Sequence, residues 1–434
     1  MNNTDISQFF DNIYGYAGTK NELYGLALAL KSIDKCSAMG IKLPTGILLY
    51  GNPGLGKTTL AKDLIAATER YAVVFRKDNG RNLAAELKKA FKLAKENQPA
   101  AILLDDMDKF SNSDSDHKNT DEYVAIQTCI DNIKNDNVVV IATANDKDCF
   151  PKSLLRAGRF DRQIHIQEPS IREATIILKT YLEKAKFSED IDTESIARLM
   201  SGRSCAELEA IINEAGIYAI AQGKDIIDMK CMIDACLAIF YHAPISDDDV
   251  NQSGKFAIAY HEAGHAVAHE LLIPNSTALV STRISSKEKS GITVFDTESA
   301  TIDFEYENKM MICALAGRAA HELKYGYPDI GSSKDIKEAS GIASFMICKE
   351  GYAGIKKTEL FAEFESDITK DQIDFEVNFI INKAYAESKK LLSKNFNLVE
   401  KIAQALVEQT TLLGKDVRKI IDQYKCEANS GKNL

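Results

Sequence analysis

The sequence has no apolar run long enough to cross a bilayer, which takes roughly 18 to 20 consecutive apolar residues. Its N-terminus, Met1 to Ser7, also lacks the basic and apolar regions of a signal peptide. We therefore expect that the chain as given is cytoplasmic and does not insert into a membrane.

Paired cysteines and basic clusters are missing as well. The nine cysteines are scattered without CxxC spacing, and their odd number argues against a disulfide framework or a cysteine zinc site. A reducing compartment fits this usage best. With 53 Lys and Arg against 63 Asp and Glu, the net charge is −10, and no long basic block occurs. A nucleic acid is therefore not expected as a main partner, because phosphate binding requires a basic face.

The periodicity of the apolar residues divides this chain of 434 residues into several domains. Strand-like runs occur up to about residue 168, and helical spacing then dominates. Residues 242–255 combine Pro, Gly and three consecutive acids without periodicity, which indicates a linker. The domains that we expect are an α/β domain (1–168), a small helical lid (169–241), the linker (242–255) and a mainly helical domain (256–434).

The expected elements of the two later domains follow from the same spacing. In the lid, the expected helices are 171–186, 192–200, 204–222 and 228–241. The C-terminal domain has a short β-like patch at 278–284 and 291–295. Its later helices are expected at 303–324, 333–350, 371–394, 396–409 and 414–424.

A phosphate-binding loop stands out in the first domain. The apolar strand Thr45 to Tyr50 runs directly into Gly51-Asn-Pro-Gly-Leu-Gly-Lys57-Thr58, and a helical run follows. In this context the backbone N–H groups surround the phosphates, Lys57 reaches the outer ones, and the Thr58 hydroxyl ligates magnesium. The predicted nucleotide-binding residues of the loop are Gly51, Asn52, Pro53, Gly54, Leu55, Gly56, Lys57, Thr58 and Thr59.

Two further apolar strands end in polar side chains. The run 100–106 ends in Asp105 and Asp106, and the run 137–145 ends in Asn145. A nucleotide hydrolase places its magnesium ligand and its water-activating base at such strand ends. We expect Asp105 to bind magnesium, Asp106 to act as the base and Asn145 to orient the attacking water. For each residue taken alone, a strand capped by a turn residue is the commoner explanation.

Only seven histidines occur, yet two stand four residues apart in His261-Glu-Ala-Gly-His265. Residues four apart lie on one face of a helix, so both imidazoles can bind one zinc ion. Glu262 then lies beside the metal, where it can take a proton from a water molecule. The alternative is a helix with polar residues on its outer face. His269 is too far along the axis to share that zinc, and we interpret it as an ordinary helix-face histidine.

Two histidines leave a catalytic zinc one protein ligand short. The metzincin spacing fails, because position 271 is Leu. The downstream acids that remain as candidates are Glu307, Glu322, Asp329, Asp335 and Glu338.

The ordered motifs resemble a known family. The phosphate loop, the strand ends at 105 and 145, and Leu155-Arg-Ala-Gly-Arg159-Phe-Asp-Arg162 resemble the AAA ATPase module. With His261 to His265 downstream, the chain is similar to the FtsH family of ATP-dependent zinc metalloproteases, from about Phe10 to about Gln423. The resemblance implies an α/β module with a parallel sheet and a helical lid, followed by a mainly α-helical zinc protease domain.

The resemblance also implies roles for single residues. Asp335 matches the third zinc ligand of the family, although Ser332-x-x-Asp335 is also a helix-capping pattern. Arg159 and Arg162 match arginine fingers that reach the ATP of the neighbouring subunit; the alternative is two arginines in a polar surface loop. The family implies zinc, ATP and magnesium as cofactors, a homohexamer, and polypeptides as substrates.

Several positions depart from the family pattern. Relatives usually begin with transmembrane segments, whereas this ATPase module starts within about ten residues of Met1, which indicates a soluble relative or a trimmed chain. Asp106 stands where a glutamate is usual, so slower hydrolysis is expected, and Cys205 replaces the first residue of a glycine-alanine pair near the nucleotide. The segment 76–82 lacks the aromatic pore loop, and 132–137 lacks the family's Asp-Gly-Phe.

We therefore expect an ATP-dependent zinc endopeptidase in which ATP hydrolysis moves polypeptides to the zinc site. Two alternatives remain open at this point. The protein could be a remodelling ATPase or chaperone whose C-terminal domain is only a scaffold. It could also be a zinc peptidase whose ATPase merely gates or assembles the ring.

Overall fold

The computed structural model describes residues 9–77, 83–110, 120–244, 252–287, 290–296, 303–329, 331–349 and 367–430. The chain forms two compact units. The first unit consists of Met1–Lys184 and Gly202–Ile212, and the second unit consists of Ala185–Ser201 and Asn213–Leu434. Residues 111–119, most of the segment 76–82 and the middle of the linker lie outside the described residues. Across the part of the chain that is described, no helix is both long and apolar enough for a membrane span.

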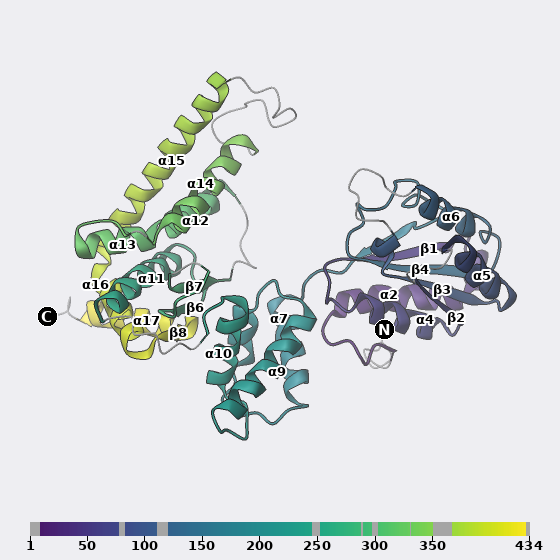
Figure 1. The fold of residues 1–434 in the computed structure, drawn as a ribbon, viewed down its shortest axis with the longest axis horizontal. Helices are drawn as coiled ribbons and strands as arrows, with labels where there is room; N and C mark the ends of the chain where they lie inside the picture. Colours follow the sequence, from purple (N-terminus) through teal and green to yellow (C-terminus); the bar gives the residue numbers. More distant parts are fainter. Residues whose placement is uncertain are drawn as a thin grey trace. The chain divides into compact units, whose positions relative to one another are not determined.

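A parallel sheet with helices on both faces forms the first unit (Figure 1). Its strand order is β2-β3-β4-β1-β5, and every registered pair is parallel. The strands are β1 Gly46–Tyr50, β2 Tyr71–Arg76, β3 Ala100–Asp105, β4 Val138–Ala144 and β5 Arg162–His165. This arrangement confirms the α/β class, because the central strands β3 and β4 are buried along their whole length, as parallel strands covered on both faces should be.

Two apolar cores lie on opposite faces of this sheet. Helices α2 (Ala17–Lys31) and α4 (Lys57–Thr68) contribute to one core, and α5 (Leu83–Glu96) and α6 (Thr120–Asp131) to the other (Figure 1). Two short elements, α3 (Ile33–Ala38) and the 3-10 turn η1 (Met107–Phe110), also belong to this unit. Because β1, β3 and β4 are neighbours, their carboxyl ends bring three distant segments of the sequence together at one edge.

Strand β5 was not expected from the sequence. Its residues are Arg-Gln-Ile-His, and only Ile164 is buried, so no apolar run or clear alternation marks it. It nevertheless pairs with β1 in parallel register and closes one side of the sheet. The strand therefore owes its place to hydrogen bonding with β1 rather than to its own hydrophobic pattern.

The expected lid helices are present within their predicted ranges. They are α7 Ile171–Leu182, α8 Thr193–Leu199, α9 Cys205–Ala221 and α10 Met229–Phe240. A capping box in which Ser170 and Glu173 hydrogen-bond each other's backbone starts α7. Helix α7 and the start of α9 belong to the first unit, and α8 and α10 to the second.

Helix α11 (Gln252–Leu272) is the centre of the second unit and packs against α13 and α16. A three-stranded antiparallel sheet of order β7-β6-β8 lies beside it. The other elements among the described residues of this unit are β6 Thr277–Ser281, β7 Ile292–Phe295, α12 Phe304–Ala314, α13 Ala316–Tyr325, α14 Ser333–Cys348, α15 Asp367–Lys394, α16 Phe396–Gln409, β8 Thr411–Leu413 and α17 Gly414–Ser430. The unit is mainly helical, as expected.

One expected helix is in fact two. The predicted helix 303–324 breaks at Leu315, where α12 ends and α13 begins. The chain crosses α11 at this point so closely that a Cβ on Gly264 would lie 2.5 Å from the Ala316 carbonyl oxygen. The apolar spacing continues through the break, so periodicity alone could not reveal it.

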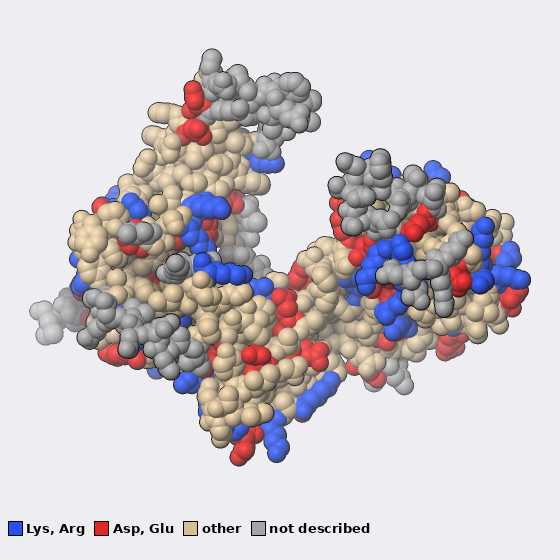
Figure 2. Space-filling view, viewed as in Figure 1, with Lys and Arg blue, Asp and Glu red and all other residues tan. Residues whose placement is uncertain are grey.

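Strand β8 was also missed, because its three residues fill the gap between two correctly placed helices. It pairs with β6, opposite β7. Figure 2 shows charged side chains of both signs interspersed over the face in view.

Candidate active site and nucleotide site

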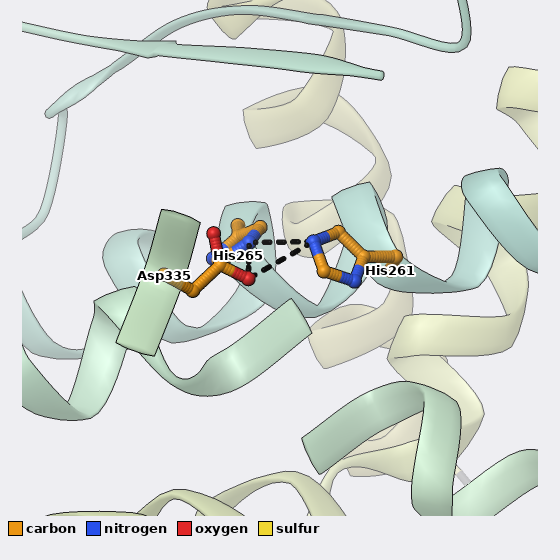
Figure 3. A group of neighbouring side chains, drawn as sticks. All are labelled: His261, His265 and Asp335. Atoms are coloured by element: carbon orange, nitrogen blue, oxygen red, sulfur yellow. Dashed lines mark hydrogen bonds and ion pairs between the residues drawn. The ribbon is translucent and has the colours of Figure 1, made fainter. Parts of the chain in front are cut away.

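Helix α11 carries both histidines of the predicted metal site, and α14 carries the predicted third ligand. His261 and His265 lie one turn apart on α11, with Nε2 atoms 3.1 Å from each other. Oδ2 of Asp335, in the first turn of α14, lies 3.2 Å from His261 Nε2 and 3.5 Å from His265 Nε2 (Figure 3). Two segments about seventy residues apart in the sequence thus place three ligand atoms around one point.

The distances between these three atoms match those between the ligands of one metal ion. Tetrahedral ligands at 2.0–2.1 Å from zinc are about 3.3 Å apart, close to the three distances observed. Oδ2 of Asp335 is buried and has no hydrogen-bond partner within the described structure, and two imidazole nitrogens face each other. A buried, unpaired carboxylate oxygen is costly unless a cation occupies the point that it faces.

A glycine keeps this space open. Gly317, in the first turn of α13, lies so close to both rings that a Cβ there would be 2.4 Å from His265 Nε2 and 2.5 Å from His261 Nε2. No larger residue fits without displacing the ligand atoms. The break between α12 and α13 therefore serves the site, because it sets Gly317 against the histidine pair.

The charge of the surrounding groups favours a cation. Burial disfavours a charged ring, but the carboxylates of Asp329 and Asp335 raise the pKa of His261 to about 10. The pKa of the Asp335 carboxyl is lowered despite its burial, because His265 and His261 lie beside it. A divalent ion supplies the positive charge that these acids otherwise draw from protonated imidazole.

Glu262 lies next to this group and is held in a fixed direction. It is 3% exposed, and its Oε2 accepts a hydrogen bond of 2.6 Å from the Thr293 hydroxyl on β7. Gly291 leaves room for its carboxylate, since a Cβ there would lie 2.6 Å from Glu262 Oε1. A cavity of about 180 Å³ is lined by these residues and by the end of α10. The site can therefore hold a water molecule beside an oriented carboxylate.

Two alternatives for α11 and α14 are wrong. The polar residues of α11 do not lie on an outer face, because His261, Glu262, His265 and also His269 are buried. His269 instead stacks on Phe295, and its Nδ1 lies 3.3 Å from the Ser276 hydroxyl. The capping pattern at 332–335 does not form a cap, because the Ser332 side chain makes no cap hydrogen bond.

The other candidate acids are placed differently. Glu322 binds Tyr385 and Lys389, and Glu338 is exposed on α14. Glu307 lies in the first turn of α12, away from the group of three. Asp329 contacts the opposite side of the His261 ring, with Oδ2 2.9 Å from Nδ1. Among the described residues, only Asp335 joins the two Nε2 atoms.

The nucleotide-binding residues gather at the carboxyl edge of the first unit's sheet. Lys57 Nζ, at the start of α4, donates to the carbonyls of Gly51 and Asn52 at 2.8 Å and to Asn145 Oδ1 at 2.9 Å. The Thr58 hydroxyl donates to Asp105 Oδ1 at 2.7 Å. Asp105 and Asn145, at the ends of β3 and β4, thus contact the phosphate loop, as expected from the parallel sheet.

Two residues that the sequence analysis missed hold Asp105. The Thr143 hydroxyl donates to Oδ1 at 2.7 Å, and Arg76 Nε at the end of β2 donates to Oδ2 at 2.6 Å. Although burial opposes it, these bonds and that of Thr58 lower the pKa of Asp105. Thr143 could have been found, since it lies two residues before Asn145 in the same predicted strand. Arg76 had no such signal.

Asp106 and the two arginines make contacts within the unit. Asp106 pairs with Lys109 at 2.7 Å and has a left-handed backbone, with φ +57°. Arg159 is buried and donates two hydrogen bonds to the Asp131 carboxylate, from Nη2 at 2.7 Å and from Nε at 3.2 Å. Arg162 pairs with Glu22 on the surface and is the more accessible of the two. Arg159 is therefore not a surface arginine in a polar loop.

A second cavity adjoins the phosphate loop. It measures about 270 Å³ and is lined by the segment 12–16, by the loop glycines, by Tyr181 and by Cys205. The Cys205 thiol lies 3.3 Å from the Tyr16 hydroxyl, and burial raises its pKa. The cysteine that departs from the family pattern therefore fits within the cavity wall.

Three family models match the chain in the order of its parts. The model of the ATPase family associated with various cellular activities (AAA) matches residues 47–168, the AAA+ lid domain 190–234, and Peptidase family M41 residues 249–420. The last of these covers both α11 and α14, and the first covers the phosphate loop and the ends of β3 and β4.

Curated relatives match most of the length of this chain. An ATP-dependent zinc metalloprotease FtsH from Cyanidium caldarium is 31% identical over 449 residues, covering 95% of this chain and 72% of the relative. FtsH 2 from Phytoplasma mali (strain AT) is 30% identical over 436 residues, 95% of this chain and 63% of its own length. FtsH from Synechococcus sp. (strain JA-2-3B'a(2-13)) is 30% identical over 449 residues, 95% and 70% of the two chains.

The AAA model thus covers the phosphate loop at the edge of the parallel sheet, and the Peptidase family M41 model covers the histidine pair and Asp335. The chain belongs to the FtsH family of ATP-dependent zinc metalloproteases.

Proposed function

We propose that this protein hydrolyses peptide bonds at a zinc ion held by His261, His265 and Asp335, with Glu262 as general base. The observation that carries the proposal is the convergence of three ligand atoms, 3.1 to 3.5 Å apart, beside a buried and oriented glutamate. Three protein ligands leave a fourth position open, which is typical of catalytic rather than structural zinc sites.

Each residue then has a defined task. Bound zinc supplies Lewis-acid polarisation of the substrate carbonyl and of water. Glu262 accepts a proton from the attacking water and delivers it to the leaving amine. Thr293 keeps the carboxylate of Glu262 turned toward the cavity through its hydrogen bond of 2.6 Å. Gly317 leaves the space that the metal requires.

In the first unit, we propose that ATP is bound by the loop 51–59, with magnesium held by Thr58 and Asp105. Asp106 and Asn145 then activate and orient the attacking water. The hydrogen bond between Thr58 and Asp105, 2.7 Å long, already sets the two oxygens side by side. Arg76 bonds the other carboxylate oxygen of Asp105, Oδ2, at 2.6 Å.

We further propose that six copies form a ring and act on polypeptides. Arg162, on the surface of the first unit, would then reach the ATP of a neighbouring subunit, and Arg159 would reach it only after leaving Asp131. Mass measurement with bound nucleotide tests the assembly. Six copies support the proposal, and a monomer at all concentrations contradicts it.

ATP dependence of proteolysis separates the proposal from its rivals. Replacing Lys57 by Ala removes a charged donor to phosphate, which should weaken ATP binding about 10- to 100-fold. Cleavage of a tightly folded substrate should then be lost, in parallel with ATPase activity. The measurement compares folded and unstructured substrates, with and without ATP. Equal cleavage of both without ATP would support a gating role only, and no cleavage under any condition would support the scaffold alternative.

A further inference from the structure

One carboxylate at the zinc site has no role in the account above. Asp329 lies between α13 and α14, and its Oδ2 is 2.9 Å from Nδ1 of His261. Its side chain is only 16% exposed. His261 is therefore placed between two acids, Asp335 at Nε2 and Asp329 at Nδ1.

Asp329 is not placed to bind the same ion. The metal point lies on the Nε2 side of the ring, where Asp335 and His265 converge. Nδ1 is on the opposite side of the imidazole, so a carboxylate beside it cannot also reach that point. The Ser332 hydroxyl donates to the Asp329 carbonyl oxygen at 3.1 Å, which anchors the segment immediately before α14.

The two histidines need the same protonation pattern to bind a metal through Nε2. Each must keep its proton on Nδ1, so that the Nε2 lone pair faces the ion. For His265, the acceptor of that proton is the Cys313 carbonyl oxygen, 2.9 Å from Nδ1. Nδ1 of His261 makes no hydrogen bond among the described residues of the structure, and the acceptor within reach of it is the Asp329 carboxylate, whose Oδ2 is 2.9 Å away.

We propose that Asp329 is a positioning residue, which holds His261 in the metal-binding tautomer and ring orientation. A carboxylate at this place also increases the electron density of the ligand ring, as partners of metal-bound histidines generally do. The inference rests on the zinc site proposed above. It adds a residue whose effect is on metal affinity first and on peptide cleavage only through the metal.

Zinc competition against a chelator tests this role without relying on activity. Replacing Asp329 by Ala should weaken zinc binding about 10- to 100-fold, the usual effect of losing such a partner. Asp329→Asn keeps the shape and one acceptor oxygen but removes the charge, so its affinity should fall between those of the wild type and Asp329→Ala. This isosteric variant also answers the question if Asp329→Ala folds poorly.

The matched control is Glu338→Ala, which removes an equal charge from an exposed position in the lining of the same cavity, one turn beyond Asp335 but outside the group of three ligands. Its zinc affinity should change by less than about threefold, because exposed charges interact weakly through water. Wild-type affinity in both Asp329 variants would overturn the inference while leaving the zinc site intact. Failure of the wild-type protein to bind zinc at all would instead overturn the proposed function. A loss as large in Glu338→Ala would show a general charge effect and would also overturn the inference.

Discussion

Glu262→Gln is expected to lower peptide cleavage by about 10²- to 10⁴-fold, the usual contribution of a general base. The amide has the size of the carboxylate and can still accept the hydrogen bond from Thr293, so the site should keep its shape. It cannot take up a proton from water at neutral pH. Casein hydrolysis measures the loss.

Two controls define this result. ATPase activity should be unchanged, because the phosphate loop belongs to the other unit. Zinc content should also be unchanged, because Glu262 is not one of the three converging ligands. If cleavage persisted at the wild-type rate with zinc bound, Glu262 would not be the base.

Gly317→Ala is expected to abolish stable zinc binding, and with it all proteolysis. The added Cβ would lie 2.4 and 2.5 Å from the two Nε2 atoms, well inside contact distance, so both ligand atoms must move. A displacement of this size breaks the geometry that zinc requires. Metal analysis of the purified variant, after dialysis, measures the effect directly.

Gly341→Ala provides the matched control. Gly341 lies in α14, the helix that carries Asp335, and nothing lies within 4 Å of a Cβ placed there. The same change should leave zinc bound and stabilise the helix by roughly 0.5–1 kcal/mol. Full zinc occupancy in Gly317→Ala would contradict the close approach on which the site depends. Zinc loss in both variants would point to disturbed folding instead.

The sequence was sufficient wherever the determinant was local. The spacing of His261 and His265 follows from helix geometry, and the phosphate loop is defined by neighbouring residues between a strand and a helix. The ends of β3 and β4 could be placed together because parallel strands share a carboxyl edge. These features depend on short-range periodicity, which a single sequence records.

Long-range features were not predictable in this way. Spacing left five acids open as the third ligand, and only the family resemblance favoured Asp335, because α14 is brought to α11 by packing rather than by sequence distance. The break between α12 and α13 at Leu315 could not be predicted, because the apolar spacing continues through it. The structural reason for the break is the close approach of Gly317 to His261 and His265, which belong to another helix. Asp329 was a candidate zinc ligand by its position in the sequence. In the structure it contacts Nδ1 of His261, on the side of the ring away from the metal point.

X-ray absorption spectroscopy of the purified zinc protein reports which atoms bind the metal and therefore tests the proposed ligands themselves. We expect one zinc per chain with only nitrogen and oxygen ligands at about 2.0–2.1 Å, two of them imidazoles. In Asp335→Ala a water oxygen can replace the carboxylate oxygen at the same distance, so the expected change in that variant is weaker retention of zinc against a chelator. Sulfur at about 2.3 Å, or zinc retained by Asp335→Ala as firmly as by the wild type, would contradict a site formed by His261, His265 and Asp335.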